Sequence, residues 1–156
     1  MKVRLIEENL AFPAIVLGFD SQGKDGYIRS LNRYVIKSPG LYAAFSKNYA
    51  LLGFLSIHGG INYSLERADG DRDFNVFAGA EKTLGSVISL VAEYNLAMND
   101  NNGEAIGNGG GYLNAGLRWA IGSGLTLSVY FKDLVHNGGS WEVANRTVRI
   151  EYVSAF

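Results

Sequence analysis

The chain has 156 residues and a formal net charge of −1, from 14 basic and 15 acidic residues. This near-neutral charge gives no reason to expect nucleic-acid binding. The absence of cysteine excludes disulfides, a thiol nucleophile and thiolate zinc sites. The longest apolar stretch, Leu10 to Phe19, contains Pro13 and Gly18, and it is too short for a membrane-spanning helix, which needs about 20 residues.

The first eight residues lack the long apolar region of a secretory signal. We therefore expect either a cytoplasmic chain or one from which a signal or an upstream segment has been removed. Residues 1–10 are expected to be an N-terminal segment or an extra strand. The rest of the chain, 11–156, is expected to complete a single domain.

Most of the sequence alternates between apolar and polar residues, as half-buried strands do. From Gly53 onward, for example, Leu55, Ile57 and Ile61 share one face. The same pattern predicts eight strands, at 13–20, 41–49, 53–64, 73–82, 86–97, 111–120, 125–134 and 145–156. A ten-residue strand tilted by about 40–45° rises roughly 24 Å, close to the height of the apolar band of a membrane barrel.

The connections between these strands alternate in length. Short turns are expected at 48–52, 83–85 and 121–124, and long polar loops at 21–40, 65–72, 97–110 and 134–144. Short turns at one end and long loops at the other are typical of outer-membrane barrels. The prediction is an all-β, antiparallel, up-and-down transmembrane β-barrel of about eight strands in a bacterial outer membrane. The strand-like stretch 33–37, inside the first long loop, could change this count.

One face of the predicted strands is apolar along its whole middle. The charged residues of that parity fall at strand ends, namely Lys47, Lys82, Asp133 and Arg146. At the bilayer midplane each would cost roughly 2–4 kcal/mol, so this placement favours a membrane. Aromatic residues cluster toward the loop end (Phe19, Tyr63, Phe74, Tyr94, Phe131) and toward the turn end (Phe12, Phe45, Tyr49, Trp119, Tyr152, Phe156). Two such girdles are typical of the two membrane interfaces.

The opposite face is polar and carries nearly balanced charges. Its candidate interior network comprises His58, Glu81, Glu93, Arg118, Lys132, Arg149 and Glu151. These charges would form either a closed, paired interior or a narrow conduction path. Eight strands leave hardly any free bore once side chains fill them, which favours the closed interior.

Two candidate sites compete with simpler interpretations. If Tyr63 pairs with Phe74, Ser56 lies opposite Glu81 and His58 lies opposite Gly79, so that Ser56, His58 and Glu81 resemble a hydrolytic trio. These side chains are assigned to the interior rather than to the lipid, which favours a hydrogen-bonded cluster. The acids of 69–73 alternate as in a calcium loop but lack its later glycine and glutamate. A solvated loop is expected there, with no metal and no cofactor in the protein.

The last strand, Arg146-Thr-Val-Arg-Ile-Glu-Tyr-Val-Ser-Ala-Phe156, is similar to the C-terminal assembly signal of bacterial outer-membrane proteins. This similarity implies the barrel-assembly machinery as a partner. Two further segments, from Arg4-Leu-Ile-Glu-Glu to Pro13-Ala-Ile-Val-Leu-Gly-Phe-Asp20 and Leu41-Tyr-Ala-Ala-Phe-Ser-Lys47, resemble hairpins of YjbH-like barrels. That family is associated with exopolysaccharide production and has much longer chains. The resemblance implies a link to exopolysaccharide export, in a shortened or terminal barrel.

The sequence therefore predicts a membrane-embedded structural or envelope component with the lipid bilayer as its surroundings and no catalytic activity. Two alternatives stay open. One is an outer-membrane lipid hydrolase that uses Ser56, His58 and Glu81, and the other is a soluble β-barrel that binds an apolar ligand. The soluble barrel would leave few charges on its exterior, which disfavours it. The oligomeric state is left open.

Overall fold

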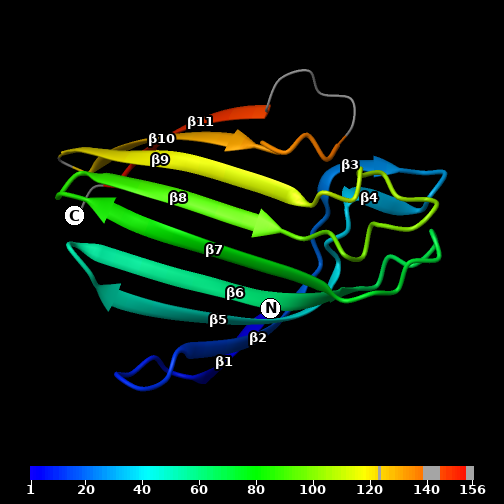
Figure 1. Ribbon diagram of the computed structural model, residues 1–156, viewed down its shortest axis with the longest axis horizontal. Coiled ribbons are helices and arrows are strands. Elements are labelled where there is room, and N and C mark those ends of the chain that lie inside the picture. The colour runs from blue at the N-terminus through cyan, green and yellow to red at the C-terminus, as the bar shows by residue number, and fades with distance from the viewer. Residues whose placement is uncertain (123, 139–144, 154–156) are drawn as a thin grey trace.

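The computed structural model describes residues 1–122, 124–138 and 145–153 (Figure 1). This part of the chain is all-β, and no helix in it is long and apolar enough to cross a membrane. Its strands are β1 (Lys2–Ile6), β2 (Ala14–Asp20), β3 (Lys24–Ile28), β4 (Arg33–Ile36), β5 (Gly40–Ala50), β6 (Phe54–Ser64), β7 (Asn75–Leu84), β8 (Ile88–Asn95), β9 (Tyr112–Gly122), β10 (Leu125–Lys132) and β11 (Asn145–Tyr152).

Among these described residues, nine strands form one antiparallel sheet in the order β1-β2-β5-β6-β7-β8-β9-β10-β11. Each of the eight predicted segments overlaps one of its strands, and β5, β7 and β9 extend one or two residues beyond the predicted bounds. The prediction of a closed eight-stranded barrel is wrong, because the sheet is open with β1 and β11 at its edges. The extra strand explains the difference: β1 pairs with β2 through Lys2–Gly18 and Val3–Leu17. It thereby occupies the edge of β2 that β11 would need for closure.

The connections are segregated between the two ends of the sheet (Figure 1). The tight connections 51–53 and 85–87 lie at one end, called here the turn end, where β9 ends and β10 begins. The long loops lie at the other, the loop end, together with the separate hairpin of β3 and β4. The sequence pattern did not predict this hairpin, although the stretch 33–37 within it has strand-forming residues.

The two faces of the sheet differ in chemistry. Directly opposed residues share a face, and one row runs Ile57–Ala80–Ala92–Ala115–Phe131 from β6 to β10. We call this apolar side the outer face. The other side, called the inner face, carries the row Ser89–Arg118–Ser128–Arg149. Polar side chains from β7 to β11 enclose a hollow of about 470 Å³ on it, so the inner face is the concave one.

Four glycines of the sheet lie directly opposite a ring that covers them. Tyr42 covers Gly18, His58 covers Gly79, Phe77 covers Gly60 and Tyr130 covers Gly116. A Cβ at position 18 would lie 2.2 Å from the Tyr42 ring, and one at Gly116 would lie 2.4 Å from Tyr130. A ring lying over a cross-strand glycine fills the space that the missing side chain leaves on a curved sheet. These four pairs are on the inner face, where the concave side crowds the side chains; a fifth, Gly59 opposite Phe45, is on the outer face with a looser fit, since its Cβ would lie 3.1 Å from the ring.

The sheet has no apolar interior of the kind that stabilises a soluble barrel. Within the described residues, the buried hydrophobic side chains are those of Ala97 and Tyr112. The buried polar residues are more numerous and lie chiefly at the loop end, including Arg33, Lys37, Asp69, Asp71, Asn99 and Asp100. The best-packed part of the molecule is therefore a polar cluster beneath the long loops.

Candidate functional site

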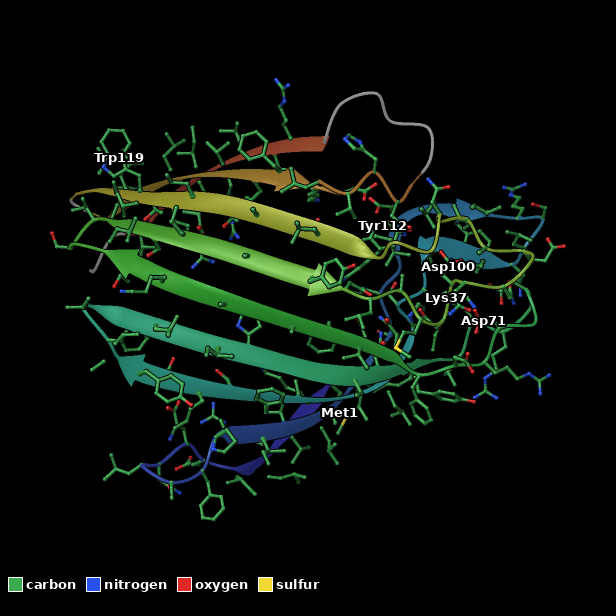
Figure 2. All side chains as sticks on the ribbon, viewed as in Figure 1. Met1, Lys37, Asp71, Asp100, Tyr112 and Trp119 are labelled. Atoms are coloured by element: carbon green, nitrogen blue, oxygen red, sulfur yellow. The ribbon has the colours of Figure 1, made fainter. Side chains whose placement is uncertain are left out.

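Three segments far apart in the sequence meet at the loop end and form what we call the loop-end cap: residues 21–39, 65–74 and 96–111 (Figure 2). Arg33 of β4 is completely buried at its centre. Its Nη1 lies 2.6 Å from Asp69 Oδ2 and 2.7 Å from Asp100 Oδ1. The Nζ of Lys37 lies 2.7 Å from Asp69 Oδ2. Two cations thus join the β3–β4 hairpin to both neighbouring loops.

The geometry of Arg33 is fixed by further hydrogen bonds. Its Nε donates to the carbonyl of Tyr34 at 3.0 Å, and its Nη2 donates to the carbonyl of Val35 at 2.9 Å. Glu66 fixes the backbone of β4 and of the residues that follow it, because its two carboxylate oxygens accept the backbone N–H groups of Tyr34 and Ser38. A buried charge is tolerated when it is paired and its remaining donors are satisfied, and both conditions hold here.

Burial and pairing act in opposite directions on the titration of the cluster. Burial alone would raise the pKa of the Asp69 carboxyl. Hydrogen bonds from Lys37, Arg33 and the Asp71 backbone outweigh it and hold the pKa of Asp69 below its ordinary value. Burial alone would lower the pKa of Arg33, but its bonds to Asp100 and Asp69 raise it instead. Pairing therefore favours the charged forms of both Arg33 and Asp69.

The prediction of a solvated loop at residues 69–73 is wrong for Asp69 and Asp71, although Gly70, Arg72 and Asp73 are exposed. Asp69 and Asp71 are each only 6% exposed, because their carboxylates point into the cap. The oxygens of Asp71 accept the backbone N–H groups of Asp73 and Asn101, at 3.1 and 3.2 Å. The described residues contain no group of three or more His, Cys, Asp or Glu side chains arranged to hold a metal ion. The cluster is suited to holding loops together rather than to binding a cation.

The inner-face charges form separate pairs. Arg118 Nη1 lies 3.1 and 3.0 Å from the two oxygens of Glu81, and its Nε donates to the Tyr130 hydroxyl. Arg149 pairs with Glu151 at 2.7 Å. The remaining members of the candidate network, His58, Glu93 and Lys132, form no ion pair within the described residues. The structure thus brings together four of the seven candidate residues, as two pairs.

The candidate trio has the expected register but not the contacts of a hydrolase. Ser56 lies opposite Glu81 and His58 opposite Gly79, as the pairing of β6 with β7 predicts. No hydrogen bond joins Ser56, His58 and Glu81 in the described part of the chain, and both Glu81 oxygens face Arg118. A nucleophile and its base need to lie within hydrogen-bond reach of one another. This arrangement therefore offers no support for a hydrolase.

The predicted girdle residues are largely exposed on the outer face. The exposed ones are Phe19, Phe74, Tyr94 and Phe131 toward the loop end, and Phe12, Phe45, Tyr49, Trp119 and Tyr152 toward the turn end. Figure 2 shows Trp119 at the end of the sheet opposite Asp100. Tyr63 is half-buried between Phe74, with ring centroids 4.9 Å apart, and the guanidinium of Arg67. Phe156 lies outside the described residues.

A cavity of about 160 Å³ separates the loop-end cap from the inner face. Lys24 and Lys37 line it from the cap, and Tyr42, Phe77 and Glu93 line it from the sheet. The cap therefore lies over the interior of the sheet with little space beneath it. A conduction path, the disfavoured alternative for the inner-face charges, would have to pass through this crowded region.

The sequence missed the buried charges Arg33, Lys37 and Asp100. The one available signal was the strand-like alternation of residues 33–37, which placed two cations in an otherwise polar loop.

A scan of family models and searches of curated proteins and of solved structures find no match to this chain.

Proposed function

We propose that this chain is a membrane-embedded β-sheet protein of a bacterial outer membrane, acting as a structural or envelope component without catalysis. The observation that carries the proposal is the exposure of large apolar side chains over the whole outer face. The central examples are Leu17, Leu41, Ile57, Ile61, Leu90, Leu117, Val148 and Ile150. Contiguous apolar surface of this extent marks a membrane or a large protein interface.

The alternative of a soluble barrel requires the opposite arrangement. Burying apolar area contributes about 25 cal/mol per Å², so a soluble β-barrel turns its apolar face inward. Here the concave face carries Arg118, Glu81 and Arg149, and the apolar rows face outward. Lipid chains in place of water would remove the cost of exposing these rows.

The charges that share the parity of the outer face also support a membrane. Lys47 donates to the carbonyls of Leu10 and Phe12 at the turn end. Lys82 donates to the carbonyl of Leu52 at 2.8 Å, also in a turn. Asp133, at the loop end, accepts the N–H of Asn137. These three charges thus satisfy backbone groups at a strand end, outside the expected apolar band, and the fourth, Arg146, lies at the loop end of β11.

A scaffold role fits the interior better than an open pore. The loop-end cap covers the loop end of the inner face, and the Arg118–Glu81 pair lies across that face between β9 and β7.

The proposed contact with the barrel-assembly machinery rests on the alternation of β11. The proposed link to exopolysaccharide export rests on the resemblance of residues 4–47 to YjbH-like barrels.

The test is refolding from urea with and without detergent micelles, followed by far-UV circular dichroism and gel electrophoresis of unheated samples. We expect a β spectrum and a heat-shifted band only when detergent is present. A monodisperse β-rich protein in plain buffer would overturn the proposal. A lipid-hydrolysis assay on the refolded protein is expected to give no activity above the detergent blank.

A further inference from the structure

Within the described residues, the main sheet ends in two strands whose outward backbone groups have no neighbour in the sheet. β1 and β11 each pair on one side only. The outer face continues to both edges, where Val3 and Ile150 are exposed. In a bilayer, an unpaired strand edge is not tolerated because its N–H and C=O groups cannot bind water. If the proposed membrane location holds, these edges must therefore be paired.

The number of strands limits how this can happen. All eight neighbouring pairs in the described sheet are antiparallel. With nine strands in strict alternation, β1 and β11 run in the same direction. Closing β1 onto β11 would create a single parallel junction in an otherwise antiparallel sheet. Single-chain bacterial outer-membrane barrels instead have even strand numbers.

A second copy of the chain does not remove this difficulty. Two copies with their loop-end caps on the same side of the membrane would again meet through β1 and β11 in parallel. Inverting one copy makes both junctions antiparallel but places its cap on the opposite side of the bilayer. An insertion process that delivers long loops to one side excludes that arrangement.

The charges at the two edges indicate the chemistry of the missing neighbour. Lys2 and Arg4 lie on the inner face of β1, since they pair with Gly18 and Val16. On β11, by contrast, Arg149 and Glu151 share the inner face and pair with each other at 2.7 Å. Opposite charges on facing positions of neighbouring strands stabilise a sheet. A strand that fits β1 would therefore carry acidic residues on its inner face and apolar residues on its outer face, whereas a strand that fits β11 needs the apolar outer face but no inner charge.

We propose that an odd number of additional β-strands, supplied by another polypeptide segment, completes the sheet between β1 and β11. Each edge-contacting strand runs antiparallel to its neighbour and has about eight to ten residues, and the strand against β1 presents acidic side chains inward. This inference rests on the proposed membrane location. It assigns β1 and β11 as interaction surfaces for these added strands.

The first experiment uses a nine-residue amphipathic peptide with a central outer-face cysteine and acidic inner positions. A matched peptide has lysine at the same inner positions. Each is incubated with detergent-refolded Val3→Cys, Ile150→Cys and, as an interior control, Ile57→Cys of β6. We expect disulfide capture of the acidic peptide at both edges several-fold above the control, and at Val3→Cys also several-fold above the lysine peptide. Equal capture at all three positions, or no preference for the acidic peptide at Val3→Cys, would overturn the proposal.

The second experiment tests closure without a partner. Val3→Cys is combined in turn with Val148→Cys, Ile150→Cys and Tyr152→Cys, and Ile57→Cys with Ala80→Cys serves as the control because those residues are directly opposed. We expect the control pair to oxidise within the monomer and the edge pairs to stay reduced. An edge disulfide within one chain, or between two chains, would overturn the inference while leaving the membrane location intact. Folding in buffer without detergent would instead overturn the location.

Discussion

Arg33 and Asp69 are 36 residues apart in the chain, yet their fully buried side chains meet at 2.6 Å beneath the long loops. The same guanidinium reaches Asp100, a further 31 residues along. Because each loop is attached to a different pair of strands, this contact ties the loop-end cap to several parts of the sheet at once. The stability of the cap should therefore depend on this pair more than on any loop sequence.

Replacing Arg33 with methionine should open the loop-end cap. The change leaves the Asp100 carboxylate buried without a cation, which typically costs about 3–5 kcal/mol. We expect faster protease cleavage of loops 65–74 and 96–111 in the refolded protein, with the heat-shifted band retained. Arg29→Met is the matched control, since Arg29 is exposed on the same hairpin. Equal cleavage of the two variants would contradict this role for Arg33.

The loop-end cap should loosen in acid. The pKa of Asp69 is lower in the folded protein than its ordinary value of 3.8, so the folded state binds fewer protons than the unfolded one. The resulting stabilisation is fully present above pH 3.8 and is lost as the pH falls through the folded value. Protection of the loops from hydrogen exchange, measured from pH 6 to pH 2 and corrected for the intrinsic exchange rate, should hold above pH 3.8 and fall below it. Asp69→Asn should flatten the pH profile, whereas the exposed Asp25→Asn should not.

The ring-covered glycines should tolerate no side chain. Gly18→Ala places a Cβ 2.2 Å from the Tyr42 ring, and such overpacking costs about 1–3 kcal/mol. Urea unfolding in micelles should show this loss, and a Tyr42→Ala background should reduce it. Gly26→Ala is the control because nothing lies within 4 Å of its added Cβ. A loss that persists undiminished without the Tyr42 ring would show that steric overlap is not its cause.

A charge in the middle of the outer face should discriminate between lipid and water as the surroundings. Leu117 lies near the centre of β9 and is 39% exposed. In a bilayer Leu117→Arg should cost about 2–4 kcal/mol, and the refolded yield in lipid vesicles should fall accordingly. In water the same change would be harmless. Val135→Arg, in a loop, should refold like the parent chain, and so would Leu117→Arg if the outer face did not contact lipid.

The strand pattern could be predicted from the sequence because it depends on neighbours along the chain. The alternation around Ile57 located β6, and pairing Tyr63 with Phe74 gave the correct register of Ser56 with Glu81. The partner of Glu81 could not be found this way. Arg118 is 37 residues away and two strands further along the sheet, so its reach across the inner face depends on curvature that no local pattern encodes.

The loop-end cap was missed for a related reason. Asp69 and Asp71, taken with their immediate neighbours, have the composition of a solvated acidic loop. Their partners Arg33 and Lys37 lie in another long loop, which folds back as β3 and β4. Closure of the sheet was also misjudged, because the short segment Lys2–Ile6 had too few residues to decide whether it was a strand.

The pairing of rings with glycines has a consequence for how the strands find their alignment. A slip of one residue exchanges the two faces and is penalised everywhere, but a slip of two residues keeps apolar side chains outward. Such a slip would move Tyr42 from Gly18 to Val16 or Asp20, and Phe77 from Gly60 to His58 or Asn62. The ring would then collide with a full side chain. The ring-covered glycines thus disfavour a two-residue slip, which the alternation of apolar and polar residues alone would allow.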